Sequence, residues 1–258
     1  MRNLYDNLLD YSTAVITAGS ADTDLPVANI QNPHRTKVYR TGTSAAAEWI
    51  KIDLATAKAV KVVVLLDHTL TSGDSLIYIQ GNATDSWGAP TFNEAMTYNA
   101  TTLKHYLSST QTFRWWRIIF TKSAAGETRD IGRVFLGPYD EMSRGPKQPD
   151  GVDISTEGLS ETSRALGGQT YSEIKSSYDK IKIQFPPMLD AQMELLKSLS
   201  AACGIHTPFF IDIDPSNEPY DLFYYGKLTK LVGRSIVYRS STAANTLWTA
   251  DMEFTEEL

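Results

Sequence analysis

Cysteine is nearly absent from this chain of 258 residues, in which Cys203 is the only one. A single cysteine cannot form an internal disulfide, so we expect a chain that folds in a reducing cytoplasm. Long apolar runs are absent as well, since no stretch approaches the roughly 18 apolar residues of a membrane-spanning helix. Met1 to Asp6 contain no apolar core of signal-peptide length, so we expect no classical secretion.

Positive charge is also scarce. The chain has 24 Lys and Arg against 30 Asp and Glu, which gives a formal net charge of −6 and a pI near 5.3. A general nucleic-acid binder needs clustered cations for the phosphates, so we expect no nucleic-acid specificity. Hydrophobic residues at 42% and charged residues at 21% are typical of a soluble globular protein. The length suits one large β domain or two ordinary ones.

Residues for metal binding or catalysis are few and scattered. The four histidines, at positions 34, 68, 105 and 206, form no pair four residues apart and have no cysteine at metal-ligand spacing. Cys203 has no identifiable base to activate it, so a small buried side chain is the favoured interpretation. Gly167-Gly168 lacks the Lys-Ser/Thr of a phosphate-binding loop and is typical of a turn. We therefore expect no metal, no cofactor and no catalytic residue, and predict that the protein is not an enzyme.

An oxygen-rich cluster near residue 214 leaves one alternative open. Asp212 and Asp214 point the same way in a strand, and Asn217 and Glu218 follow, so the cluster offers several calcium ligands. The spacing of an EF-hand loop is absent. An Asp-Pro turn at Asp214-Pro215 is the favoured interpretation.

Short strands are the main feature of the first half. Residues 49–54, Trp-Ile-Lys-Ile-Asp-Leu, alternate with a period of two, which predicts a strand with one face in a core. Residues 60–66 are almost continuously apolar, which predicts a strand covered on both faces. Residues 55–59 are too few for a crossover helix, so we expect the two strands to pair antiparallel or to lie in two packed sheets. Further short strands, separated by turns up to residue 138, predict an all-β sandwich.

Arginine and tryptophan alternate with apolar residues in the strand predicted near residues 113–121. A mixture of basic and aromatic residues is able to hold single-stranded nucleic acid. However, alternation places Trp116 and Ile118 on one face and Trp115 and Arg117 on the other. Two opposed faces of this kind favour a strand packed between the core and a neighbouring domain, with Arg117 paired to a carboxylate.

Residues 82–100 form a long predicted loop that is rich in Asn, Thr, Gly and Pro. The loop carries Trp87, Phe92 and Tyr98, and long loops often carry binding surfaces. Aromatic faces suit the apolar side of a sugar ring, so these three residues are the predicted glycan platform. The alternative is that their rings pin the loop to the sandwich or contact another subunit.

Proline and glycine are densest between residues 137 and 151, where we expect a domain boundary. The predicted division is a jelly-roll domain at residues 1–138, a linker at 139–151 and a second domain at 152–258. The fold class is thus mainly β, with an N-terminal jelly-roll β-sandwich and a C-terminal α+β domain.

The second domain combines strands with one convincing helix. Residues 188–203 carry apolar side chains at three- and four-residue spacing, and Gly204 supplies a C-terminal stop. Residues 180–185 alternate cleanly as a half-buried strand. Residues 152–166 are predicted to form a hairpin broken by Gly158. An antiparallel sheet with a single helix packed on it is the expected result.

The first half resembles the galactose-binding-like jelly roll of discoidin and coagulation-factor type C domains. The resemblance lies in residues 29–40, in Trp-Ile-Lys-Ile-Asp-Leu at 49–54 and in Phe-Arg-Trp-Trp-Arg-Ile at 113–118. In that family a tryptophan opens a W-I-x-I-D-L strand, and a later R-Y-x-R-I strand completes the sandwich. The chain departs from the secreted members in lacking their disulfide.

The second half resembles a ring-forming module of long-tailed bacteriophage tails, of the distal tail or baseplate hub type. The resemblance is one of element order, from the strand at 180–185 and the helix led by Pro186-Pro187 to the C-terminal strand that ends at Leu258. It implies a structural tail protein, made in the bacterial host cytoplasm and located in the virion tail. It also implies a hexameric ring of copies that contacts other tail proteins. The alternative is a carbohydrate-binding or receptor-binding module of a tail, which would bind a surface glycan.

Overall fold

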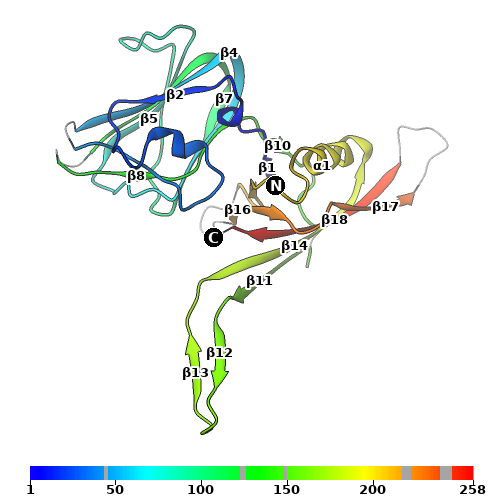
Figure 1. Ribbon diagram of the computed structural model, residues 1–258. Helices are drawn as coiled ribbons and strands as arrows, with labels where there is room; N and C mark the ends of the chain where they lie inside the picture. Colours follow the sequence, from blue (N-terminus) through cyan, green and yellow to red (C-terminus); the bar gives the residue numbers. More distant parts are fainter. Residues whose placement is uncertain (44–45, 123–125, 148–149, 217–221, 239–245, 258) are drawn as a thin grey trace. The chain divides into compact units, whose positions relative to one another are not determined.

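The computed structural model describes the chain except residues 44–45, 123–125, 148–149, 217–221, 239–245 and 258. The described chain is mainly β and contains one α-helix (Figure 1). It divides into two compact units, each with its own hydrophobic core. Unit 1 consists of Met1–Tyr5 and Asp140–Leu258, and unit 2 consists of Asp6–Tyr139.

Unit 2 is a β-sandwich of the jelly-roll class. Its larger sheet has the strand order β2-β4-β7-β5-β6, with β9 also paired to β4, and its smaller sheet pairs β3 with β8. The strands are β2 (Val15–Ala18), β3 (Tyr39–Arg40), β4 (Ala47–Leu66), β5 (Ser75–Asn82), β6 (Phe92–Ala95), β7 (Thr102–Thr121), β8 (Asp130–Ile131) and β9 (Val134–Gly137). Two short 3₁₀ helices, η1 (Leu8–Asp10) and η2 (Val27–Gln31), complete the unit.

The two strands predicted at residues 49–54 and 60–66 are one continuous strand, β4. Its pairing with β7 shifts register between Asp53 and Lys58, and Ala55 has a φ of 62°. This left-handed conformation is rare outside glycine and marks a local irregularity of the strand. The expectation that the two runs pair with each other or lie in two sheets is therefore wrong, because a bulge absorbs the intervening residues without reversing the chain.

The predicted alternation in the larger sheet of unit 2 is confirmed. Ile50 and Ile52 of β4 are fully buried, as are Trp116 and Ile118 of β7. Their neighbours along the same strands point away from the core and are half-buried. This part of the sheet thus has one core face and one outer face, whereas Val62 to Leu66 are all buried, as predicted for a strand covered on both faces.

Unit 1 is an α+β unit with the strand order β10-β1-β15-β16-β18-β14-β11, and β17 is also paired to β18. The strands are β1 (Arg2–Leu4), β10 (Asp140–Glu141), β11 (Val152–Gly158), β14 (Ser177–Leu189), β15 (Phe209–Asp212), β16 (Phe223–Leu228), β17 (Gly233–Tyr238) and β18 (Leu247–Glu256). Helix α1 (Asp190–Cys203) packs on the core through Met193, Leu196 and Leu199. It ends at Gly204, as predicted, where φ is 55°.

The start of the chain, Met1–Tyr5, belongs to unit 1 and not to the jelly roll, for which residues 1–138 were predicted. Strand β1 pairs with β15 on one side and with β10 on the other. Residues 140 and 141, which fall within the predicted linker, are thus part of a sheet. The division at Tyr139 lies one residue from the predicted end of the first domain, so the jelly roll is an insertion after the first strand of unit 1.

A long two-stranded arm extends from the sheet of unit 1 (Figure 1). It begins as the pair β11–β14 and continues as β12 (Glu161–Arg164) and β13 (Thr170–Glu173). The chain turns at the tip, where Gly168 has a φ of 86° and its N–H donates to the carbonyl of Ala165 at 2.9 Å. Gly167-Gly168 is therefore a turn, as predicted. The predicted break at Gly158 is confirmed, since β11 ends there and β12 begins at Glu161. The predicted hairpin is wrong in its pairing, because β11 pairs with β14 and β12 pairs with β13.

Candidate functional sites

The outer face of the larger jelly-roll sheet carries a cluster of tryptophans and charged residues. We define this outer tryptophan face as Trp49, Lys51 and Asp53 of β4, Gln80 of β5, Trp115 and Arg117 of β7, and Asp85 and Trp87 of the loop after β5. Strand alternation turns these side chains away from the core because their immediate neighbours on β4 and β7 are buried.

The register of β4, β7 and β5 places two cations side by side on this face. Lys51 is the direct partner of Arg117, and Arg117 is in turn the direct partner of Gln80. Like charges directly opposite each other on neighbouring strands are destabilising. A sequence that keeps two cations here departs from the local rule, and such departures occur mainly at functional sites.

Asp85 links the loop to the sheet. Its two carboxylate oxygens accept hydrogen bonds from Lys51 Nζ at 2.7 Å and from Trp87 Nε1 at 2.6 Å. Lys51 lowers the pKa of the Asp85 carboxyl below its usual value, so the carboxylate stays ionised at neutral pH. Trp87 is thereby held over the sheet.

The cations lie against the indole rings. Lys51 Nζ is 5.6 Å from the centroid of Trp49 and 5.5 Å from that of Trp115, and the Arg117 guanidinium carbon is 4.6 Å from the centroid of Trp87. Cations at these distances are attracted by the ring quadrupole. The outer tryptophan face is therefore one connected cluster.

Arg117 differs from the other cations of this face in its hydrogen bonding. Its Nε donates to Gln80 Oε1 at 2.8 Å, and within the described part of the chain its two terminal nitrogens donate to no protein group. The prediction that Arg117 pairs with a carboxylate is therefore wrong, because its partner is an amide oxygen. It is neighbouring Arg114 that pairs through two nitrogens with a carboxylate, that of Asp53, at 2.7 and 2.8 Å. Burial lowers the pKa of Arg117 from its usual value, as expected for a cation with incomplete compensation.

The three residues of the predicted glycan platform do not lie together. Trp87 lies on the outer face, whereas Phe92 and Tyr98 pack against the core of unit 2. Phe92 is 6.0 Å from the ring of buried Trp116, and Tyr98 is 6.3 Å from that of His68. The predicted loop at 82–100 is wrong in part, because Phe92 begins strand β6, which pairs with β5. The apolar rings of Phe92 and Tyr98 gain more from the core than from solvent, so they hold this segment against the sandwich.

Sequence reasoning missed Trp49 and Lys51 as neighbours of Trp87. The alternation of β7 had already placed Trp115 and Arg117 on one face. The register between β4 and β7 depends on the irregularity after Asp53. Alternation along a single strand does not show which residue of the next strand lies opposite, so this register could not be predicted.

The described residues contain no gathering of three or more His, Cys, Asp or Glu side chains that could hold a metal ion. Asp212, which belongs to the alternative calcium cluster, is buried in β15, and Asn217 and Glu218 lie outside the described residues. Burial raises the pKa of the Cys203 thiol to about 12, which leaves little thiolate at neutral pH. No helix in the described ranges is both long and apolar enough to cross a membrane.

One Ser, His and Glu group lies on β6 and β7. Glu94 contacts both partners, since it accepts a hydrogen bond from Ser108 Oγ and lies 3.1 Å from His105 Nε2. Nucleophilic activation requires the imidazole between the hydroxyl and the carboxylate. The carboxylate occupies the middle position here, so this arrangement joins two strands and does not activate Ser108.

The arm of unit 1 exposes apolar side chains along its length. Leu166 at the tip has a relative exposure of 111%, and Ile174 on the returning strand has one of 91%. Leu159 and Tyr171 are also exposed, and the remaining side chains from 153 to 177 are solvent-exposed too. An isolated two-stranded ribbon is at best marginally stable in water. We therefore expect the arm to gain stability when another surface covers its apolar side chains.

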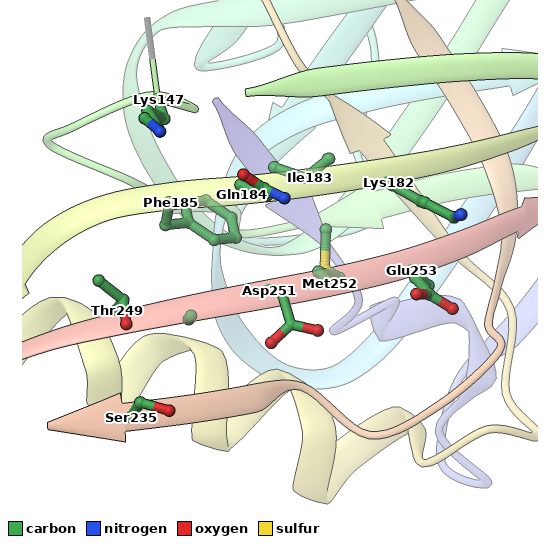
Figure 2. A pocket seen from close by; sticks show the side chains of 11 residues that line it. Lys147, Lys182, Ile183, Gln184, Phe185, Ser235, Thr249, Asp251, Met252 and Glu253 are labelled. Carbon is green, nitrogen blue, oxygen red and sulfur yellow. The ribbon is translucent and has the colours of Figure 1, made fainter. Parts of the chain in front are cut away.

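A shallow hollow of about 410 Å³ lies over β14, β18 and β17 of the same unit (Figure 2). Lys182 of β14 is the direct partner of Glu253 of β18, and Gln184 is that of Asp251. Lys147 also lines the hollow, so its two lysines equal its two carboxylates in number. It lacks the converging acid, base and nucleophile of a catalytic site.

No protein-family model matches the sequence, and a search of curated proteins found no match. Solved structures resemble part of the chain. A Ruminococcus gnavus GH29 fucosidase in complex with fucose is 15% identical with a TM-score of 0.43, and the match covers 52% of this chain and 27% of the fucosidase. The family 32 carbohydrate-binding module of Clostridium perfringens NanJ in complex with galactose is 11% identical, with a TM-score of 0.40 and coverage of 54% and 100%.

A fucose-binding module of Streptococcus pneumoniae is similar to the same extent, at 17% identity and a TM-score of 0.42, with coverage of 52% of this chain and 99% of the module. This chain thus spans about a quarter of the fucosidase and nearly all of the two modules. At these identities and TM-scores the likeness carries no argument about what this chain binds.

Proposed function

We propose that the protein is a non-catalytic structural protein that assembles with copies of itself through the arm of unit 1. The observation that carries the proposal is the exposed apolar side chains of the arm, above all Leu166 and Ile174. A two-stranded ribbon with no core of its own gains stability when a second chain covers it. A copy of the same chain is the most common partner in soluble assemblies.

A closed ring suits this arrangement because it leaves few unpaired strand edges. The sheet of unit 1 ends in β10 on one side and in β11 on the other, and β11 continues into the arm. The resemblance in element order implies the setting: a hexameric ring in a bacteriophage tail, made in the bacterial cytoplasm and in contact with other tail proteins. The jelly roll would then be an appendage of that ring.

Native mass spectrometry of the full chain and of a variant with a shortened arm tests the proposal. Leu159 N–H donates to the carbonyl of Ser176 at 3.0 Å, so residues 160–175 can be replaced by an Asn-Gly turn that closes the ribbon there. We expect a discrete homo-oligomer for the full chain and a monomer for the shortened chain. Val15→Ser, which removes an exposed apolar side chain of unit 2, is the control and should leave the oligomer intact.

A second candidate function is saccharide binding by the jelly roll. It is favoured by the three half-buried indoles of Trp49, Trp87 and Trp115 on one sheet face. Rings on a rigid sheet are suited to stacking against sugar rings. Binding on a glycan array that is lost in Trp87→Ala would support this function, and unchanged binding would contradict a role of this face.

A further inference from the structure

The unpaired guanidinium fork of Arg117 is the starting point. The outer tryptophan face and adjacent Arg114 contain three cations and two carboxylates, and two of the cations are matched: Lys51 by Asp85, and Arg114 by Asp53. Arg117 is left as the surplus positive charge of the face. It is half-buried over Trp87, and its terminal nitrogens donate to no described residue.

Gln80 holds this guanidinium in a fixed orientation. Its Oε1 accepts from Arg117 Nε, and its Nε2 donates to Asn93 Oδ1 at 3.0 Å. With Nε occupied and its carbon 4.6 Å from the Trp87 ring centroid, the guanidinium offers its terminal nitrogens to a ligand. Two parallel N–H groups of arginine match the geometry of a carboxylate and bind it in a bidentate manner.

The surrounding structure favours a saccharide over a peptide. Strands β4, β7 and β5 each have neighbours on both sides, so their backbone groups are already paired and cannot accept an added strand. A ligand must therefore bind through side chains alone. The face offers flat indole rings for stacking and the amide of Asn93 and carboxylate of Asp85 for hydroxyl groups.

We propose that the outer tryptophan face binds an acidic saccharide, whose carboxylate is held by Arg117 and whose sugar rings lie against Trp87, Trp115 and Trp49. The inference rests on the second candidate function and adds the chemical class of the ligand. In this account Gln80 is a positioning residue, because it fixes Arg117 and need not touch the ligand itself.

Isothermal titration calorimetry of the full chain tests the proposal, with tetragalacturonic acid as the probe and its methyl ester as the uncharged match. We expect the acid to bind at least about tenfold more tightly than the ester, because the neutral ester cannot form the pair of charge-assisted hydrogen bonds with Arg117. Arg117→Gln should weaken binding of the acid by about the same factor. Arg40→Gln, which removes an arginine paired with Asp130 elsewhere in unit 2, is the control and should bind like the unmodified chain.

Each other outcome overturns the proposal. Equal binding of acid and ester that depends on Trp87 would leave the saccharide function standing and refute the acidic class. Equal binding of a poly-L-glutamate oligomer would refute the saccharide class. The absence of any saccharide binding would refute both this proposal and the second candidate function. If Arg117→Gln does not fold, Arg117→Lys keeps the charge without the fork and should still lose most of the preference for the acid over the ester.

Discussion

Arg129 and Asp74 form a bidentate ion pair inside unit 2, with Nε–Oδ2 at 2.7 Å and Nη2–Oδ1 at 2.8 Å. The Asp74 side chain is fully buried and that of Arg129 is 7% exposed. Arg129 also pairs with Glu127, but the Glu127 side chain is 44% exposed. Removal of Asp74 therefore takes away the buried partner of the Arg129 charge. The pair links Asp74, which directly precedes β5, to Arg129, which directly precedes β8.

We predict that Asp74→Ala lowers the free energy of unfolding by about 3–5 kcal/mol. Asp67→Ala is the matched control, since Asp67 pairs with Arg35 where both side chains are partly exposed. That control should cost no more than about 1 kcal/mol. Urea denaturation followed by tryptophan fluorescence measures both values, and equal losses would contradict the difference in burial.

Gly81 is required by the close approach of an aromatic ring. A Cβ at this position would lie 2.6 Å from Phe113 Cδ2, and the Phe113 ring in turn packs 5.8 Å from that of Trp116. We predict that Gly81→Ala costs about 1–3 kcal/mol through overpacking of this aromatic group. Gly88→Ala, where no atom lies within 4 Å, should change the melting temperature little. A neutral Gly81→Ala would show that the ring moves freely.

The buried thiol of Cys203 gives a prediction in alkaline solution. Burial raises its pKa from 9.0 to about 12, so the folded state holds the proton more tightly than the unfolded state does. The contribution to stability is complete below pH 9 and is lost as the pH rises from 9 towards 12. Cys203→Ala should flatten the fall in the free energy of unfolding over this window.

Thiol labelling gives an independent check on Cys203. At pH 8 we expect an aromatic disulfide reagent to react far more slowly with the native chain than with the chain in denaturant, since the sulfur is buried. Equal rates in the two states would contradict both the burial and the raised pKa.

The sequence predicts those parts of the fold that depend on local periodicity. Alternation correctly placed Trp116 in the core and Arg117 on the opposite face, and three- and four-residue spacing located α1. The continuity of β4 through Ala55 was not predictable, because a non-glycine residue at positive φ leaves no mark in a hydrophobic pattern.

The candidate site and the arm could not be predicted from local periodicity. The outer tryptophan face brings Lys51 beside Arg117 through a strand register, and it brings Trp87 there through a loop. The arm packs on no core, so its apolar residues are exposed and do not alternate with buried ones, and the periodicity that identifies a half-buried strand is missing. Its strand β13, in particular, has four exposed residues.

Hydrogen exchange of the arm amides shows whether another copy of the chain covers the arm of unit 1. The full chain is measured at high and at low protein concentration, and peptides from residues 159–176 are followed by mass spectrometry. We expect strong protection of these amides at high concentration and loss of that protection on dilution. Fast exchange of the arm that is the same at both concentrations would contradict this expectation.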